Sequence, residues 1–507
     1  MMGRPRSLQR ADGEPFALAA IVGALGAEFT AAAGVSRLER RTRLDTFDGR
    51  LRAARLALEH RVDAAAARLE LVLAAATMIE APTGRGLRWP AFTAVLPAGP
   101  VRDAVAPVAG IRALVAVSAE RRLLRRVDLR NVDGKIVARV ELDEPAPPGQ
   151  APGRSPAQLR VYPLRGYDGE ARRAVRLLQG AGLGWLEPAP PAAAGRPPRP
   201  GGDPAEAAPV LLARALTGFL ATMRANLPGV LDDVDTEFLH DFRVALRRTR
   251  ATLKLGRPVL GAAFSTRWEP ALGWLGEVTA PGRDLDVYLL GLPAMAAWLV
   301  AADAADLELF AEHLGRRRAA DRDELVRTLR SVRFRRLIRD WDEELTRLAT
   351  GPVGAPGQIR SAGELAKQAS SGAYRRVVRG GAAITRISPA VDLHRLRSRC
   401  KELRYALEVF APLIEAGART RIVADLTALQ DVLGRFQDSQ VQRDALGVFA
   451  GEMMAQGTTA AALLAMGELI GHLDADQRRA RTEFEGVFAR FAARSTDWRR
   501  DALGGAG

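Results

Sequence analysis

Five basic side chains between positions 240 and 254 recur at the spacing of one helical face. Counted from the first, they fall at offsets 0, 3, 7, 10 and 14, and they are His240, Arg243, Arg247, Arg250 and Lys254. At about 100° per residue, these offsets form a single stripe along an α-helix. The opposite face is mostly apolar and consists of Phe242, Leu246, Thr249 and Leu253. The pattern predicts an amphipathic helix over 237–256 with an almost purely cationic polar face.

The same pattern returns in the second half of the chain. Offsets 0, 3, 7 and 10 are here occupied by His394, Arg397, Lys401 and Arg404, and the opposite face by Leu396, Cys400, Leu403 and Leu407. Offset 14 breaks the match, because Glu408 stands where the first stripe has Lys254. A further landmark follows each stripe, since Arg-x-x-Asp occurs at 283–286 and again at 435–438. Two matched landmarks in the same order predict an internal duplication.

Two interpretations of the stripes are open. Charged helix faces are commonly just solvated. A solvated face, however, normally mixes charge signs, because i,i+4 Glu–Lys pairs stabilise a helix and like charges destabilise it by a few tenths of a kcal/mol per pair. Two stripes that both accept this repulsion favour the second interpretation, in which an anionic ligand binds there.

The residues of these stripes resemble a known family. The motifs are His-x-x-Arg-x-x-x-Arg-Arg-x-Arg from 240, Arg-Asp-Leu-Asp-Val at 283–287, Leu-His-Arg-Leu-Arg-x-x-x-Lys-x-Leu-Arg-Tyr-x-Leu-Glu at 393–408, and Leu-Gln-Asp-Val-Leu-Gly at 429–434 with Asp438. In this order they are similar to the CHAD family (conserved histidine α-helical domain), over roughly 210 to 500. The resemblance implies two pseudo-symmetric helical bundles, with halves at about 210–350 and 364–500. It also implies that inorganic polyphosphate binds in a basic groove whose walls are the two stripes.

Each candidate site residue has an expected role. Direct phosphate contact is expected from Arg243, Arg247, Arg250, Lys254, Arg397, Lys401 and Arg404, because guanidinium and ammonium groups are the usual phosphate donors. The histidines His240 and His394 are open to two interpretations, as phosphate donors or as satisfied interior groups. Asp286 and Asp438 are expected to orient arginines, and Arg283 and Tyr405 to support the site. No metal ion and no cofactor are expected, because the stripes lack ligands at metal spacing.

Composition points to the same class of partner. The 507 residues carry a formal net charge of +15 with a sequence pI near 10.9, which favours polyanions such as polyphosphate or nucleic acid. Cys400 is the single cysteine, so an intrachain disulfide is excluded. No run of 18 apolar residues indicates a membrane span, and acidic Asp12 and Glu14 argue against a signal peptide. The expected location is the cytoplasm, and attachment to polyphosphate granules is an inference from the family alone.

The N-terminal region has a different pattern. Strands are predicted at 55–62, 68–74, 112–119, 121–129, 135–142 and 158–164, and a helix at 170–178. Asp133-Gly134 predicts a two-residue hairpin turn, and the regular spacing favours an antiparallel sheet or barrel. The segment Leu44-Asp45-Thr46-Phe47-Asp48-Gly49-Arg50-Leu51-Arg52, with Leu56-Ala57-Leu58 and Arg61, and the hairpin carrying 138–144 resemble CYTH domains, which are triphosphate tunnel enzymes. The expected fold class is therefore α+β: a CYTH-like domain at 1–186, a linker at 187–209, and an all-α CHAD domain at 210–500.

The departures from the CYTH pattern bear on activity. Such enzymes hold a divalent metal with Glu-x-Glu strands, since Mg²⁺ prefers oxygen ligands. The first strand is expected near Glu14–Leu18 and has no Glu-x-Glu, while 159–164 carries Arg and Tyr where acids belong. No lysine occurs at 70–77, where the family has one. Glu141, Asp143 and Glu144 remain, and they cannot rebuild the site alone, so we expect a degenerate, non-catalytic fold.

Beyond the linker, the periodicity is helical. The 187–209 segment is rich in Pro and Gly and predicts a semi-rigid spacer. The first stripe helix is expected to stop near Gly256 and Pro258. Further helices are predicted at 268–278, 284–290, 304–314, 322–341, 419–436, 441–451, 459–474 and 477–494, with a Gly- and Pro-rich boundary at 351–363.

Three functions from different classes remain. The first is polyphosphate binding beside an inert CYTH-like domain. The second is metal-dependent hydrolysis of triphosphate or polyphosphate by residues 15–185, which the missing carboxylates oppose. The third is binding of nucleic-acid backbones, which is sequence-blind. Only 6% of the residues are aromatic and none alternates with the stripes, so base stacking has no platform.

Overall fold

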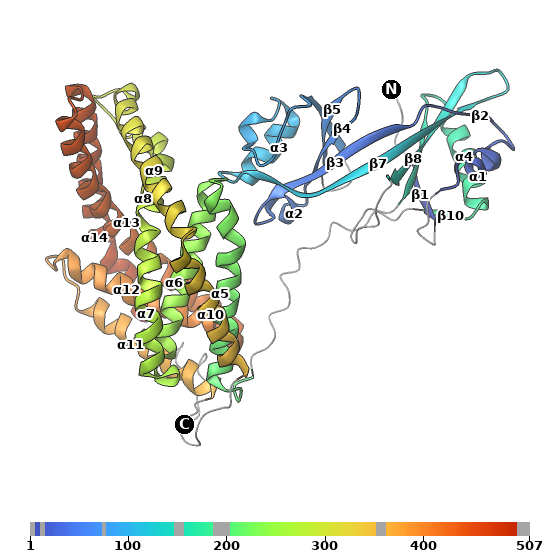
Figure 1. Ribbon diagram of the computed structural model, residues 1–507. Helices are drawn as coiled ribbons and strands as arrows, with labels where there is room; N and C mark the ends of the chain where they lie inside the picture. The colour runs from blue at the N-terminus through green and yellow to red at the C-terminus, as the bar shows by residue number, and fades with distance from the viewer. Residues whose placement is uncertain are drawn as a thin grey trace. The chain divides into compact units, whose positions relative to one another are not determined.

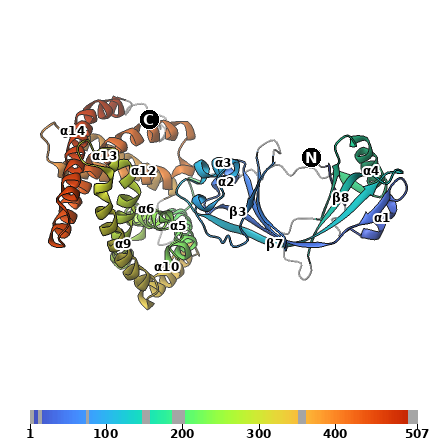
Figure 2. The ribbon, with the colours of Figure 1, turned by 90° about the horizontal axis from the view of Figure 1, so that it is seen from above.

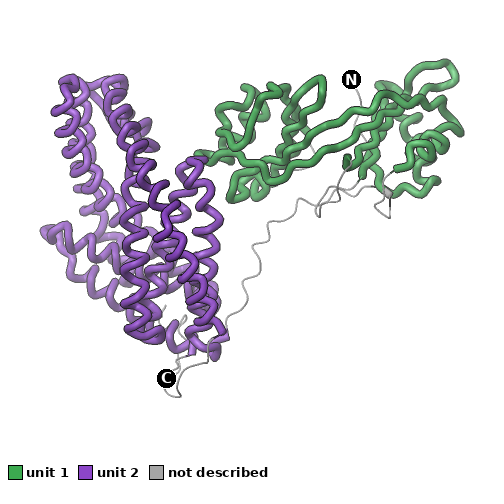
Figure 3. Tube along the Cα trace, viewed as in Figure 1, with its two compact units in different colours: residues 1–197 green, residues 198–507 purple. Residues whose placement is uncertain are grey.

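The chain forms two compact units, residues 1–197 and 198–507, in a computed structural model (Figure 3). The structure describes residues 6–10, 16–73, 78–146, 157–185, 203–350 and 361–493. Most of the predicted linker (186–202) and most of the predicted boundary between the helical halves (351–360) lie outside these residues. Each unit is described by itself below.

The first unit is one antiparallel sheet of ten strands with helices at both ends. Its strands are β1 (Arg6–Arg10), β2 (Thr30–Ala33), β3 (Arg37–Thr46), β4 (Ala57–Val62), β5 (Ala67–Val72), β6 (Met78–Thr83), β7 (Leu114–Arg130), β8 (Ile136–Pro145), β9 (Gln158–Pro163) and β10 (Leu183–Trp185). The sheet order is β10-β1-β9-β8-β7-β3-β4-β5-β6, and β2 pairs with β7. The helices are α1 (Leu18–Leu25), α2 (Arg50–Ala53), α3 (Pro100–Ala109) and α4 (Asp168–Gly180).

The long strands β3 and β7 connect two apolar cores (Figures 1 and 2). Along β7, Leu114 belongs to the core under α2 and α3, whereas Val127 belongs to the core under α1 and α4. Between them Arg122 is fully buried, as are Glu39 of β3 and Asp143 of β8. The middle of the sheet therefore encloses charged side chains.

Several sequence predictions for this unit need correction. The first strand is β1 (Arg6–Arg10), not the segment near 14–18, of which 14 and 15 lie outside the described residues. The strands predicted at 112–119 and 121–129 are one continuous strand, β7. The Asp133-Gly134 turn is present with Gly134 at φ +73°, but the loop is longer than two residues, because Asn131 N–H donates to the Lys135 carbonyl at 3.0 Å.

The second unit is a helical bundle over the residues that the structure describes, 203–350 and 361–493 (Figure 1). Its long helices are α5 (Ala208–Leu231), α6 (Thr236–Leu260), α7 (Ala262–Val278), α8 (Ala280–Ala296), α9 (Glu308–Leu329), α10 (Val332–Thr350), α11 (Ala362–Ala382), α12 (Ala390–Val409), α13 (Ala416–Ala455) and α14 (Ala460–Ala493). Within the described ranges, no helix is both long enough and apolar enough to cross a membrane.

Three apolar cores hold the helices together. One combines α5, α6, α7, α9 and α10, and its centre is Trp341, packed 4.7 Å from the Trp268 ring. A second combines α11 to α14 with the beginning of α5. The third is shared between the halves, because α8 and α9 pack against α13 and α14 there. The shared core makes the two bundles parts of one compact unit.

Helix boundaries differ from the predictions where a local signal was overridden. The stripe helix α6 passes Gly256 and Pro258 and ends at Leu260, before Gly261 with φ +85°. The segments predicted at 419–436 and 441–451 are one helix, α13, and those at 459–474 and 477–494 are one helix, α14. Arg316 to Arg318, expected between two helices, lie inside α9.

Candidate functional site

The first stripe lies on α6, as predicted. The Asp235 side chain accepts hydrogen bonds from the backbone N–H groups of Glu237 and Phe238 and so caps the helix start. The apolar face is buried, with Phe242, Leu246, Thr249 and Leu253 each at most 2% exposed. The stripe faces outward: Arg247, Arg250 and Lys254 are exposed, and His240 and Arg243 are half-buried.

The second stripe lies on α12, and its core side is buried to the same degree. Cys400 is fully buried, and burial raises the pKa of its thiol to about 12, so it is an inert core group. His394 is exposed, whereas Arg397, Lys401, Arg404 and the supporting Tyr405 are half-buried.

The two helices pack against each other within the helical unit. The Arg248 guanidinium on α6 lies 3.1 Å from the Glu408 carboxylate on α12. The stripes are also electrostatically coupled, since burial and the charges of Arg397 and Arg247 lower the pKa of Lys401 to about 8. Arg247 and Lys401, the central members of the two stripes, are therefore neighbours.

Backbone and hydroxyl oxygens position the first-stripe arginines. Arg243 Nη1 donates to the Gly276 carbonyl at 3.0 Å and to Thr279 Oγ1 at 2.9 Å. Burial lowers the pKa of Arg243, and the positive charge of Arg247 lowers it further. The negative charge of Asp284 partly raises it again. A Cβ atom on Gly276 of α7 would lie 2.7 Å from Arg250 Nη1, so this glycine leaves room for the Arg250 side chain. Within the described part of the chain, Arg247, Arg250 and Lys254 have no hydrogen-bonding or ion-pairing partner.

Side chains of α13 position the second stripe. Asp438 Oδ1 accepts from Arg397 Nη2 at 3.0 Å, and Gln437 Oε1 lies 2.9 Å from His394 Nδ1. Arg404 donates to Glu408 at 2.8 Å and to Thr427 Oγ1 at 3.0 Å. Asp438 therefore contacts a stripe arginine, Arg397.

Asp286 does not hold a stripe residue. It is 2% exposed and accepts from Arg318 Nε at 2.6 Å, and Arg318 also pairs with Asp233 at 2.7 Å. Arg283, the other supporting residue on α8, donates to the Thr236 carbonyl at 3.3 Å. Burial and the Arg283 charge lower the pKa of His240, which keeps this imidazole neutral at pH 7.

The contacts correct the register of the internal repeat. Equivalent stripe residues are 154 positions apart: 240 and 394, 243 and 397, 247 and 401. The same spacing relates Arg283, which is close to His240, to Gln437, which contacts His394. It also relates Asp284, which is close to Arg243, to Asp438, which contacts Arg397. The Arg-x-x-Asp match is therefore displaced by two residues. Tyr288 Oη donates to the Gln442 carbonyl at 2.6 Å, so a position contacts its own equivalent, as expected near a pseudo-twofold axis.

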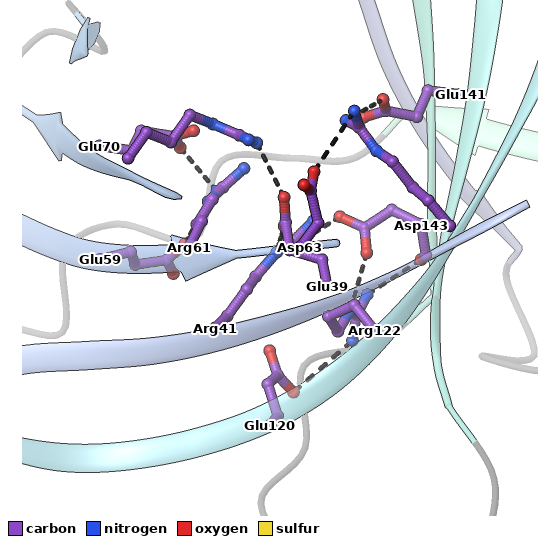
Figure 4. Close-up of polar contacts among 12 residues, drawn as sticks. Glu39, Arg41, Glu59, Arg61, Asp63, Glu70, Glu120, Arg122, Glu141 and Asp143 are labelled. Carbon is purple, nitrogen blue, oxygen red and sulfur yellow. Dashed lines mark hydrogen bonds and ion pairs between the residues drawn. The ribbon is translucent and has the colours of Figure 1, made fainter. Parts of the chain in front are cut away.

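The interior of the first unit is a network of buried ion pairs (Figure 4). Arg41 donates to Glu39 and to Asp143, each at 2.6 Å, and Arg122 Nε donates to Asp143 at 2.7 Å. Farther along the sheet, Arg61 donates to Glu70 at 2.6 Å. Glu39 and Arg41 were not predicted, because inward-facing charges on β3 escape a search for apolar alternation, whereas Asp143 was expected to remain from a metal site.

The carboxylates expected to remain from a metal site are occupied. Asp143 is held by two arginines, Glu144 Oε1 accepts from the Phe16 N–H at 2.8 Å, and Glu141 lies 3.7 Å from Arg37. In the described residues no three His, Cys, Asp or Glu side chains are grouped to hold a metal ion. Guanidinium groups at these oxygens would repel a divalent cation, so the residues do not fit the metal that CYTH-type chemistry requires.

Comparison with known proteins follows the same division. The family description "CHAD domain" matches residues 214–447. The crystal structure of the CHAD domain from Ricinus communis is 27% identical, with a TM-score of 0.48, and covers 57% of this chain and 93% of its own. PptA from Streptomyces chartreusis is 20% identical, with a TM-score of 0.44, and covers 56% and 100%.

A third solved structure matches the N-terminal region. This Hippeastrum protein, described as having a dominant triphosphatase activity, is 17% identical, with a TM-score of 0.28, and covers 36% of this chain and 91% of its own. A search of curated proteins found no match. The buried apolar faces and the paired stripe helices lie within residues 214–447, the part of this chain that matches the CHAD domain.

Proposed function

We propose that this chain binds inorganic polyphosphate along the stripes of α6 and α12, and that its first unit is a CYTH-like domain without catalytic activity. We assign 1–186 to the CYTH-like domain, 187–209 to the linker and 210–500 to the CHAD domain. The protein is proposed to act in the cytoplasm, with attachment to polyphosphate granules as the accompanying expectation.

The proximity of Arg247 and Lys401 carries this proposal. Arg247 and Lys401 come from different halves and their charges repel each other: burial, Arg397 and Arg247 lower the pKa of Lys401, and Asp438 only partly opposes this. A polyphosphate chain, with about one negative charge per phosphate as in a nucleic-acid backbone, would relieve that repulsion. Arg250 and Lys254 extend the positive charge along α6. Arg397, which pairs with Asp438, extends it along α12.

Each side chain would contribute differently to binding. Arginine offers a planar fork of donors that matches two phosphate oxygens, and lysine offers a compact charge. Arg243 and Arg397 are already oriented by oxygens of α7 and α13, so less side-chain entropy is lost when they bind. His394 Nδ1 donates to Gln437 Oε1, so Nε2 can donate to a phosphate only when the imidazole is protonated.

The hydrolase alternative has less support. Triphosphate hydrolysis of the CYTH type needs carboxylates that hold a divalent metal. Arg41 and Arg122 occupy both oxygens of Asp143, and β1 contributes no acid. The nucleic-acid alternative lacks aromatic platforms on the stripe helices, because Phe238 and Phe242 of α6 are buried and Tyr405 of α12 is half-buried.

A competition titration tests the proposal. The wild type and the double variant Arg247→Glu with Lys401→Glu would be titrated with long-chain polyphosphate, single-stranded DNA and double-stranded DNA, at two salt concentrations, with and without magnesium. We expect polyphosphate to bind most tightly at physiological salt and the double variant to bind it at least a hundredfold more weakly, because each charge-assisted contact contributes roughly 1.5–3 kcal/mol.

A matched control separates position from net charge. Arg336→Glu with Arg490→Glu changes the charge by the same amount on exposed helix faces outside the stripes, and it should leave most of the affinity. Equal loss in both double variants would reduce the stripes to solvated surface. Equal competition by DNA would overturn the polyphosphate assignment, and magnesium-dependent phosphate release would support the hydrolase instead.

A further inference from the structure

A pocket of about 250 Å³ lies at the beginning of α12, between α13 and α14. Its lining includes Ala390, Phe436, Gln440, Arg443, Arg478 and Arg481. Three guanidinium groups line this pocket, and none of its lining residues in the described part of the chain is Asp or Glu. It lies outside the nine stripe residues.

The internal repeat places an equivalent pocket in the first half. The lining of that pocket includes Thr236, Gly282 and Asp286. The positions 154 residues later are Ala390, Phe436 and Gln440, which line the second-half pocket. The first-half pocket measures only about 20 Å³. It is filled by ion pairs, since Arg318 contacts Asp286 at 2.6 Å and Asp233 at 2.7 Å.

The second half has lost the carboxylates. Asp233, Asp235 and Asp286 all line the first-half pocket. The positions 154 residues later are Ile387, Pro389 and Gln440. Asp235 also caps α6, whereas Pro389 has no side chain that can cap α12. In the first half the protein's own carboxylates therefore stand where the second half leaves an open, cationic space.

The three arginines of the open pocket are held to different degrees. Arg481 donates to the Ser388 carbonyl at 2.6 Å and stacks over the Phe436 ring at 5.1 Å, so its charge is positioned by neutral groups. Arg443 contacts the Asp474 carboxylate at 2.7 Å. Arg478 makes no side-chain hydrogen bond or ion pair within the described ranges.

We propose that this pocket binds a phosphate group, as a site that continues the α12 stripe for a polyphosphate chain. Gln437 and Asp438, which contact His394 and Arg397, lie on α13 between the pocket residues Phe436 and Gln440. A phosphate there would accept hydrogen bonds from the guanidinium groups, as the carboxylates do in the first half. As a continuation of the stripe, the site rests on the proposed function.

Pyrophosphate, the shortest polyphosphate, is the probe for the pocket, and the stripe variant shows how much of its binding the stripe cations supply. Calorimetric titration would compare the full-length wild type with three variants: Arg478→Gln removes the unpaired cation, Pro389→Asp restores the first-half carboxylate, and Arg490→Gln makes the same charge change as the first outside the pocket on α14. We expect about tenfold weaker pyrophosphate binding for Arg478→Gln and for Pro389→Asp, and wild-type binding for Arg490→Gln.

Pro389→Asp carries a second readout that reports folding. A carboxylate at the α12 start should raise Tm, as helix caps do, while it lowers phosphate binding. A raised Tm with unchanged pyrophosphate binding would overturn the pocket proposal. Unchanged binding in Arg478→Gln would overturn it as well.

The stripe variant distinguishes failure of this inference from failure of the proposed function. Arg247→Glu with Lys401→Glu should lose long-chain polyphosphate and keep pyrophosphate in the pocket. If only the stripe variant loses pyrophosphate binding, the pocket proposal fails and the proposed role of the stripes is retained. Long-chain binding that survives the stripe variant while Arg478→Gln removes pyrophosphate would support the pocket and overturn the stripes.

Discussion

Lys401 shows how a single residue reports the charge around it. It is half-buried beside Arg397 and Arg247, with Asp438 as the one compensating acid among the causes of its shift. Burial and the neighbouring cations both disfavour its charged form, which is why its pKa falls from 10.5 to about 8. The surrounding arginines stay charged at any working pH.

Affinity for polyphosphate should therefore fall as pH rises from 7 to 9, because Lys401 loses its proton near pH 8. Lys401→Arg should remove most of this dependence, and titrations at pH 7, 8 and 9 check it. The stability of the free protein should change in the opposite direction. Between about pH 8 and 10.5 the unfolded chain binds more protons at this residue, so stability rises with pH there. An identical pH profile in Lys401→Arg would contradict this assignment.

Asp143 has the corresponding role in the first unit. It is fully buried, and although burial disfavours its charge, Arg41 and Arg122 lower its pKa below the usual value. Asp143→Ala should destabilise this unit by roughly 3–5 kcal/mol, because it removes the carboxylate that the two buried guanidinium groups of Arg41 and Arg122 share. Hydrogen exchange of β3, β7 and β8 in the full-length protein measures the effect. Asp168→Ala, on the same unit at the start of α4, is the control and should leave these strands protected.

At the scale of helices, the two halves share one order of helices but differ in where a helix is interrupted. α7 and α8 of the first half correspond to the single helix α13 of the second. Pro281 lies in the first turn of α8, where its missing N–H is tolerated, while the equivalent position is Arg435, which continues the helix. The long helix reaches the shared core, where α8 and α9 also pack.

Glu408 is the one stripe position where the helices differ in charge sign. It contacts Arg248 at 3.1 Å and Arg404 at 2.8 Å, both partly exposed, so Glu408→Lys should change stability by about 1 kcal/mol or less. It also restores the cation that Lys254 supplies on α6. We expect several-fold tighter polyphosphate binding and a steeper loss of affinity with salt, because one more counterion is released. Glu402→Lys, on the same helix but off the stripe, is the matched control; an equal gain there would mean that net charge alone decides affinity.

At the scale of the whole molecule, each unit has its own cores, and no apolar cluster among the described residues combines the two. The sheet unit depends on buried ion pairs in its middle, and the helical unit depends on large apolar side chains such as Trp341.

Calorimetry of the full-length protein should show two unfolding transitions. A ligand stabilises only the unit that binds it, so polyphosphate should raise the transition of the helical unit and leave the other unchanged. The Asp143→Ala variant assigns the transitions, because it lowers only that of the sheet unit. A shift of the sheet transition by polyphosphate would place a ligand site in the first unit and contradict the proposed division of roles.

The sequence alone determined the stripes, their repetition and the family, because helical periodicity records which side chains share a face. It also identified five of the ten described strands of the first unit, namely β4, β5, β7, β8 and β9. Its errors came from local sequence signals. Pro258 predicted the end of a helix and Asp133-Gly134 predicted a two-residue turn, but packing with other parts of the chain decides where an element ends.

Only the tertiary structure decided which groups meet. It placed Arg247 close to Lys401 and showed that the second landmark of the repeat is displaced by two residues. It also showed that Asp286 pairs with Arg318 and not with a stripe arginine. Pairing of this kind depends on contacts between segments more than 100 residues apart, for example Arg41 with Asp143, and no periodicity within one element encodes such contacts.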